Sequence, residues 1–161
     1  MISANRFSLT VLVVLLILSN VFWAYAYFTS IQQRDNALRE GTTALAIILA
    51  HASTLLKEAG DKGQNEYLEV AYMLVDQAIP VAQTLDKLTG GSSWTHKIIS
   101  AIASLHDLLA NTHQGYTINK DKLTKIGDTL RNLAKALKNL NIENIEHYSE
   151  RLEAIAYSQS Q

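Results

Sequence analysis

The stretch from Phe7 to Phe28 is the feature that most constrains this chain, because its 22 residues include no charged side chain. As a helix it would be about 33 Å long, which matches a hydrocarbon core of roughly 30 Å. Thirteen of its residues are Leu, Ile, Val or Phe, and each favours membrane insertion by about 0.3 to 0.6 kcal/mol at the centre of a helix. The sequence therefore predicts a single transmembrane helix in contact with the lipid bilayer from Phe7 to Phe28, within a segment of residues 1–30.

The end of this stretch is compatible with two outcomes, retention as a membrane anchor or cleavage by signal peptidase. Its last seven residues include five aromatic ones: Phe22, Trp23, Tyr25, Tyr27 and Phe28. Such a cluster is typical of a membrane–water interface and favours a retained signal-anchor. Ala24-Tyr25-Ala26 also fits a signal-peptidase site, so a protein secreted after cleavage following Ala26 is the alternative. Because Arg6 precedes the apolar run as in signal segments, we expect a single-pass protein of the cell membrane with an extracytoplasmic C-terminal domain.

Composition limits the part of the chain beyond the anchor. The chain has 161 residues, and the roughly 130 beyond the apolar segment suffice for one domain with one core. A net charge of −1 gives no basic excess for binding nucleic acid, and the absence of Cys excludes disulfides and thiolate metal sites. A single proline and no strand-like alternation predict an all-α chain.

Apolar residues spaced three and four apart predict the helices of the bundle. A first helix over residues 31–60 continues from the membrane, the remaining helices occupy 61–158, and 31–158 form one domain with a tail at 159–161. Each of the five expected helices has one apolar face. From the first helix to the fifth, the residues of these faces are Leu38, Leu45, Ile48, Ala52 and Leu55; Tyr67, Val70, Leu74, Val81, Leu85 and Leu88; Trp94, Ile98, Ala101, Ile102, Leu105, Leu108 and Leu109; Leu123, Ile126, Leu130, Leu133, Leu137 and Leu140; and Ile142, Ile145, Leu152 and Ala156.

Local signals predict where these helices begin, bend and end. Gly60 is the expected end of the first helix, and Pro80 is expected to kink the second near Gln77. Asparagines are the expected N-caps of the second, fourth and fifth helices: Asn65, Asn119 and Asn141. Whether the fourth and fifth helices are separate or continuous stays open at this point.

Segments of about twenty residues with glycine-rich connections predict an antiparallel bundle of four or five helices. We expect the fourth and fifth helices to pair through opposite charges. The basic residues are Lys120, Lys122, Lys125, Arg131, Lys135 and Lys138, and the acidic ones are Glu143, Glu146, Glu150 and Glu153. The regular heptad-like seams are also compatible with a homo-oligomer.

The residues that could perform chemistry do not form a reactive constellation. Glu143, His147 and Glu150 share one helical face, but that face lies opposite the apolar one, whereas bundle metal sites hold their ligands inside. His106 and His113 would lie about 10 Å apart along a helix, too far to share one ion. Residues 90–93, Gly-Gly-Ser-Ser, lack the lysine of a phosphate-binding loop. We therefore expect no catalytic, metal or cofactor-binding residue, and no enzyme.

Two functions fit these features. The first is a membrane-tethered extracytoplasmic interaction or scaffold module that contacts an unknown protein partner, for which an uncovered apolar strip is expected. The second is a ligand-sensing or small-molecule-binding bundle acting with a partner subunit. Its layout resembles the extracytoplasmic four-helix domains of chemoreceptors, in which a membrane helix continues into the first bundle helix. That resemblance is one of layout alone, and a kinked helix at Pro80 with a ligand-sized internal cavity lined by polar residues would favour this second function.

Overall fold

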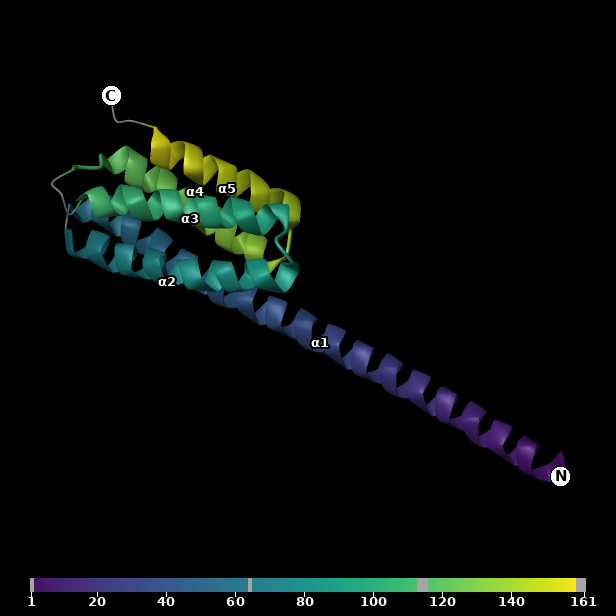
Figure 1. Ribbon diagram of the computed structural model, residues 1–161. Helices are drawn as coiled ribbons and strands as arrows, with labels where there is room; N and C mark the ends of the chain where they lie inside the picture. The colour runs from purple at the N-terminus through teal and green to yellow at the C-terminus, as the bar shows by residue number, and fades with distance from the viewer. Residues whose placement is uncertain (1, 64, 113–115, 159–161) are drawn as a thin grey trace. The chain divides into compact units, whose positions relative to one another are not determined.

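The computed structural model describes residues 2–63, 65–112 and 116–158, with side chains from Leu16 onward, so the expected tail at 159–161 lies outside the described residues. The described residues form five α-helices: α1 Ile2–Lys62, α2 Asn65–Thr89, α3 Ser93–Thr112, α4 Lys120–Lys138 and α5 Ile142–Tyr157 (Figure 1). Within these ranges the chain contains no β-strand. The predicted all-α class is therefore confirmed for the described part of the chain.

The chain divides into two compact units, Met1–Ala37 and Leu38–Gln161. The second unit is a helical bundle that contains the last part of α1 together with α2 to α5. In it α2 packs against α3, α3 against α5, and α5 against α4. The end of α1 contacts α4 and α2. These helices thus enclose one core.

Helices that are consecutive in the chain run antiparallel, as the short connections predict. The pair α3 and α5 is parallel, because Lys97 contacts Glu146 and, further along both helices, Ser100 contacts Glu153. The bundle therefore contains a parallel pair, α3 and α5, beside its antiparallel ones.

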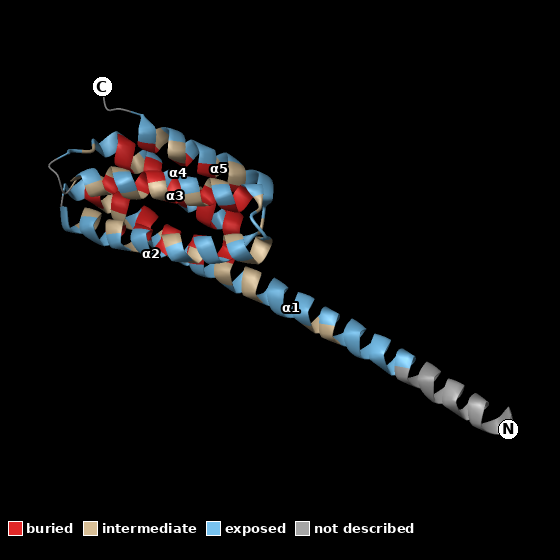
Figure 2. Ribbon diagram, in the orientation of Figure 1, coloured by how far each residue is buried: buried red, intermediate tan, exposed pale blue. Residues whose placement is uncertain are grey.

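The core is aliphatic, and its buried residues lie on the inward faces of the helices (Figure 2). Its largest fully buried side chains are all Leu or Ile. The predicted faces of α3 and α4 are confirmed from Trp94 to Leu109 and from Leu123 to Leu137, apart from Leu108, which is only half-buried.

The predicted faces of α1 and α2 were partly wrong. In α1 the fully buried leucines include Leu49 and Leu56, whereas the expected Ile48 and Leu55 are half-buried. In α2 the centre of the face is formed by small residues: Ala71, Val75, Ala78 and Ala82, with Leu85. The larger residues Leu74 and Val81 pack at the edge of the core instead. The physical reason is that alanines let α2 approach its neighbours closely, so they occupy the inward positions.

The helix ends depend on local backbone chemistry. Asn119 and Asn141 are confirmed as N-caps, because their side chains accept hydrogen bonds from the backbone N–H groups of Lys122 at 2.8 Å and Asn144 at 3.1 Å. The fourth and fifth helices are therefore separate. Asn65 is instead the first residue of α2. The helix α2 runs through Pro80 from Asn65 to Thr89, and the kink stays a prediction.

The first bundle helix ends at Lys62, with Gly63 as the glycine just past its end in place of the predicted Gly60. Gly63 adopts φ +65°, and its N–H donates to the carbonyl of Ala59 at 2.9 Å, which is a left-handed helix cap. Gly60 remains helical, and a Cβ there would lie 3.4 Å from the Lys120 carbonyl oxygen. Gly60 therefore serves the packing of α1 beside the start of α4.

The closest approach between these two helices lies at Ser53 and Gly127. The buried Ser53 hydroxyl donates to the Gly127 carbonyl at 2.7 Å. A Cβ on Gly127 would lie 3.0 Å from the Ser53 carbonyl oxygen and 2.8 Å from Cγ of Lys57. A Cβ at position 127 would therefore force both the Lys57 side chain and the α1 backbone to shift.

We expect Gly127→Ala to lower the free energy of unfolding by about 1 to 3 kcal/mol, because the added methyl group overpacks the contact. Helix propensity alone would predict the opposite sign. Gly60→Ala is the matched control, since its Cβ meets only ordinary contacts, and it should be neutral or stabilising by up to about 1 kcal/mol. Urea unfolding of the full chain measures both. Equal stabilisation by the two variants would contradict the close contact.

Ser149 of α5 gives a second stability prediction. Its hydroxyl is fully buried, and it finds no hydrogen-bond partner in the described part of the chain. Ser149→Ala removes an unpaired polar group, so it should stabilise the bundle by about 1 kcal/mol in thermal or urea unfolding. Ser53→Ala, which removes a paired buried hydroxyl, should destabilise it by about 1 kcal/mol. A loss of stability in Ser149→Ala would show that the hydroxyl has a partner.

Candidate functional site

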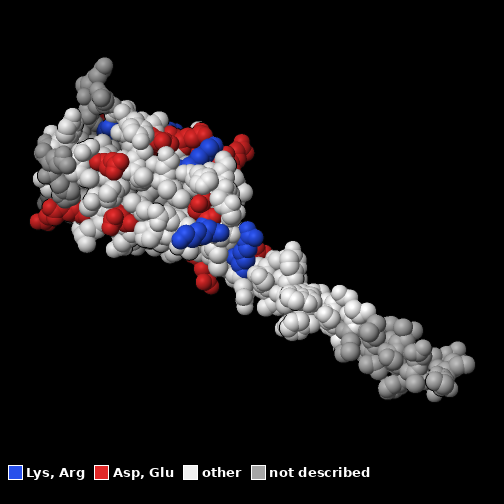
Figure 3. All heavy atoms as spheres, viewed as in Figure 1, with Lys and Arg blue, Asp and Glu red and all other residues white. Residues whose placement is uncertain are grey.

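The described N-terminal part of α1 exposes large apolar side chains in an unusual concentration. Ten of them, between 39% and 71% exposed, lie within 16 residues: Leu16, Ile17, Leu18, Val21, Phe22, Trp23, Tyr25, Tyr27, Phe28 and Ile31. Successive helical positions point about 100° apart, so these side chains surround the helix. No charged residue occurs within these 16 residues, whereas charged side chains of both signs are scattered among uncharged ones on the visible face of the bundle (Figure 3). A helix that is apolar on every side is normally buried in protein or in lipid.

The predicted transmembrane helix, Phe7 to Phe28, is described only in part. The side chains of residues 1–15 lie outside the described ones, which leaves Leu16 to Phe28. In the described part of the chain, no helix has a stretch both long and apolar enough to span a bilayer. The aromatic cluster, Phe22 to Phe28, lies within the described residues. The rings of Phe22 and Trp23 are arranged edge to face, with their centroids 6.4 Å apart.

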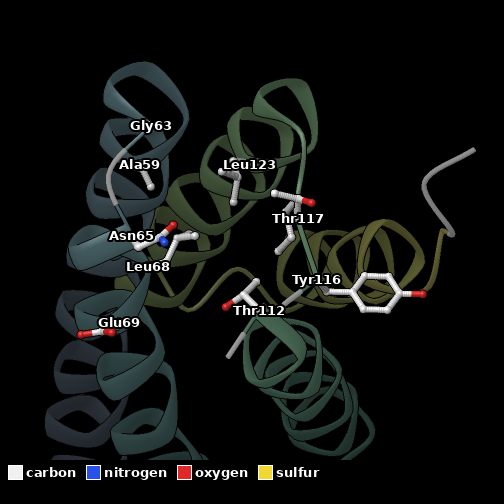
Figure 4. Close-up of a pocket in the computed structure, with 10 residues that line it drawn as sticks. Ala59, Gly63, Asn65, Leu68, Glu69, Thr112, Tyr116, Thr117 and Leu123 are labelled. Carbon is white, nitrogen blue, oxygen red and sulfur yellow. The ribbon is translucent and has the colours of Figure 1, made fainter. Parts of the chain in front are cut away.

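A pocket of about 440 Å³ opens at one end of the bundle. It lies between the end of α1, the start of α2, the end of α3 and the segment that enters α4 (Figure 4). Its lining residues are Ala59, Gly63, Asn65, Leu68, Glu69, Thr112, Tyr116, Thr117, Ile118 and Leu123. Small residues create the space, because Ala59 and Gly63 present little or no side chain where α1 ends. No sequence motif marks this site, since its residues come from four separate segments.

Two of the three residues considered as metal ligands, Glu150 and His147, have other contacts. The Lys97 ammonium of α3 donates to Glu150 at 2.7 Å and to Glu146 at 3.1 Å. The His147 ring lies against Tyr148, with ring centroids 5.2 Å apart. No group of three or more metal-binding side chains occurs among the described residues.

Two histidines of α3 lie at its contact with α2. His106 stacks on Tyr72 with ring centroids 4.8 Å apart, and its Nε2 lies 3.6 Å from Asp76. His96 lies 3.5 Å from Asp86 in the same pair of helices. His113 lies outside the described residues. His96 and His106 thus border a helix–helix contact.

The predicted charge pairing between α4 and α5 was wrong for three acidic residues of α5. Glu146 and Glu150 bind Lys97, and Glu153 accepts a hydrogen bond from Ser100 at 2.8 Å, so all three face α3. Lys120 of α4 pairs with Asp61 of α1 at 2.9 Å. The physical reason is that α5 is in contact with two helices, and its acidic side faces α3.

Lys122 binds α5 in a different way. It is buried, and its ammonium donates to the carbonyl oxygens of Ser158 at 2.6 Å and Ala156 at 3.4 Å. Burial lowers the pKa of Lys122 below its usual range. The negative end of the α5 dipole supplies the compensating charge. The cation therefore caps the C-terminus of α5.

Comparisons with protein families, with curated proteins and with solved structures gave no match to this chain. The candidate sites thus rest on the geometry of the chain itself.

The Lys97 contacts generate a pH prediction. A hydrogen bond from Lys97, with a smaller one from Ser93, holds the pKa of Glu146 below its usual range. Because its folded-state pKa is depressed, Glu146 stabilises the bundle above the unfolded pKa of about 4.3, and this contribution is lost as the pH falls through the folded-state pKa. The stability difference between wild type and Glu146→Gln should therefore shrink below about pH 4.3 in urea titrations. A difference that stays constant from about pH 6 to about pH 3 would contradict it.

Proposed function

We propose that this protein is a membrane-tethered helical module that acts by binding and not by catalysis. The segment Phe7 to Phe28 attaches it to the lipid bilayer, and the bundle lies on the extracytoplasmic side, where it contacts another protein. The observation that carries the proposal is the exposure of ten large apolar side chains around residues 16–31. In water such a surface is costly, at roughly 25 cal/mol for each Å² of apolar area. A bilayer removes that cost.

The order of residues along the segment supports tethering. Aliphatic side chains come first, from Leu16 to Leu18, and the aromatic cluster comes after them, from Phe22 to Phe28. Aromatic rings favour the interface, so the cluster would sit near the headgroups while the aliphatic part occupies the hydrocarbon. Charged residues begin with Arg34 and Asp35, beyond the interface. Arg6 on the other side of the run favours translocation of the bundle.

The binding role is supported by the outer face of α2. Val70 is 46% exposed and Met73 is 59% exposed, and they lie about one turn apart. This exposed apolar pair is smaller than the strip expected from the sequence, and polar residues such as Glu66 and Gln77 flank it. A contact through it would be modest in size, which fits a module that is concentrated at its partner by the membrane.

The double variant Ile17→Arg with Val21→Arg tests the attachment. An arginine costs about 2.5 to 3.5 kcal/mol at the centre of a spanning helix, where Ile17 lies, and less at Val21, which is nearer the interface. Together the two charges should move most of the protein from the membrane to the soluble fraction. The matched control is Ile47→Arg, an exposed isoleucine of the bundle, which should stay in the membrane fraction. Equal membrane recovery of both variants, measured after carbonate extraction of cells, would refute the anchor.

Orientation and cleavage are tested by one further measurement on a C-terminally tagged chain. The proposal expects a full-length, membrane-bound species whose tag is removed by protease added outside intact cells. A soluble product that begins at Tyr27 would replace the anchor with secretion after Ala26. A tag that resists the external protease until the membrane is lysed would reverse the orientation.

A further inference from the structure

The pocket at the end of the bundle has the size of a ligand site. Its volume of about 440 Å³ falls within the roughly 300 to 1,000 Å³ that is usual for small-molecule pockets. We propose that it binds a small neutral molecule with an apolar body and one hydrogen-bonding group. This site is independent of the bilayer attachment proposed above.

The floor of the pocket is apolar and continuous with the core. Ala59 and Leu123 belong to the buried core, with 4% and 3% exposure. Leu68 and Ile118 are half-buried and pack against that core. An apolar group placed against these four residues would leave water and contact aliphatic carbon, although polar surface makes up the larger share of the exposed lining.

Polar side chains lie at the rim. Asn65 supplies a donor and an acceptor at the start of α2, and Thr117 supplies an exposed hydroxyl. The Thr112 hydroxyl already donates to the Leu109 carbonyl at 2.6 Å, so its oxygen is left as an acceptor. Figure 4 shows Asn65, Thr112 and Thr117 around the hollow that Leu68 and Leu123 line. One polar group of a ligand can therefore bond at the rim while the rest of the ligand contacts the floor.

The surrounding charges select against an ion. Glu69 is the one charged side chain among the described lining residues, and its carboxylate points away from the others in Figure 4. The nearby cations have partners already: Lys62 contacts Glu58 at 3.4 Å and Tyr67 at 3.1 Å, and Lys120 pairs with Asp61. A charged ligand would lose hydration over the apolar floor, and among the described lining residues only Glu69, whose carboxylate is directed away from the others, carries a charge. The site therefore favours neutral molecules.

Three probes of nearly equal size test this selection: benzyl alcohol, benzoate and benzylammonium. Methyl resonances of Leu68, Ile118 and Leu123 in the full chain are followed by NMR at equal free probe concentrations. We expect saturable shifts of these methyl groups with benzyl alcohol, and at least tenfold weaker binding of the two charged probes. Shifts that do not saturate, shifts centred elsewhere, or equally strong binding of a charged probe would overturn the proposal.

A blocking variant links the shifts to the pocket. Thr117→Trp places a large ring at an exposed rim position, so it should weaken benzyl alcohol binding at least tenfold without disturbing the core. The control is Thr84→Trp, at an exposed position of α2 that does not line the pocket, and it should bind as the wild type does. Unchanged affinity in Thr117→Trp would place the binding elsewhere and overturn the assignment.

Discussion

The bundle depends on the contact between Ser53 of α1 and Gly127 of α4. The two helix backbones approach so closely there that a Cβ at position 127 would displace its neighbours on α1, and the buried Ser53 hydroxyl donates a hydrogen bond across the gap. This contact, with Lys57 and Asp128 paired beside it, joins two helices whose contacting residues are 74 positions apart in the sequence. Gly41 plays a similar role towards α2, where an added Cβ would lie 2.7 Å from Cδ2 of Leu85. Small residues thus set the spacing at which the leucines of the core interlock.

Much of the fold could be predicted from the sequence because many of its signals are local. The faces of α3 and α4 carry large aliphatic residues at regular spacing, and the caps at Asn119 and Asn141 need only the adjacent turn of helix. The face of α2 was predicted poorly, because size was used as a guide to burial and the inward positions are mainly alanines. Gly60 and Gly63 look alike in the sequence, and only the backbone conformation and the neighbouring α4 distinguish their roles.

The two proposed functional surfaces, the apolar segment and the pocket, also differ in how far the sequence reveals them. The apolar segment is visible in the sequence, since it is defined by composition along a continuous stretch. The pocket is not visible in the sequence, because its lining residues come together only in the folded chain. Four separate segments contribute to it, with Ala59, Leu68, Thr112 and Ile118 among the lining residues. The charge partners of α5 were mispredicted for a related reason: complementary totals on α4 and α5 do not specify which side of a helix faces which neighbour. The partner of each charged side chain depends on how α5 is rotated about its own axis. The number of charges on each helix does not determine that rotation.

The position of α5 affects how the chain matures. This helix packs against both α3 and α4, and it is the last of the described helices to leave the ribosome. Until α5 is synthesised, the faces of α3 and α4 that it will cover stay exposed to water and to other nascent chains. The earlier helices can pair, but the assembly is completed only when α5 arrives. Its acidic side chains then join Lys97, and Lys122 closes its far end. A nascent chain halted before α5 would therefore expose apolar faces of α3 and α4 and be prone to aggregate.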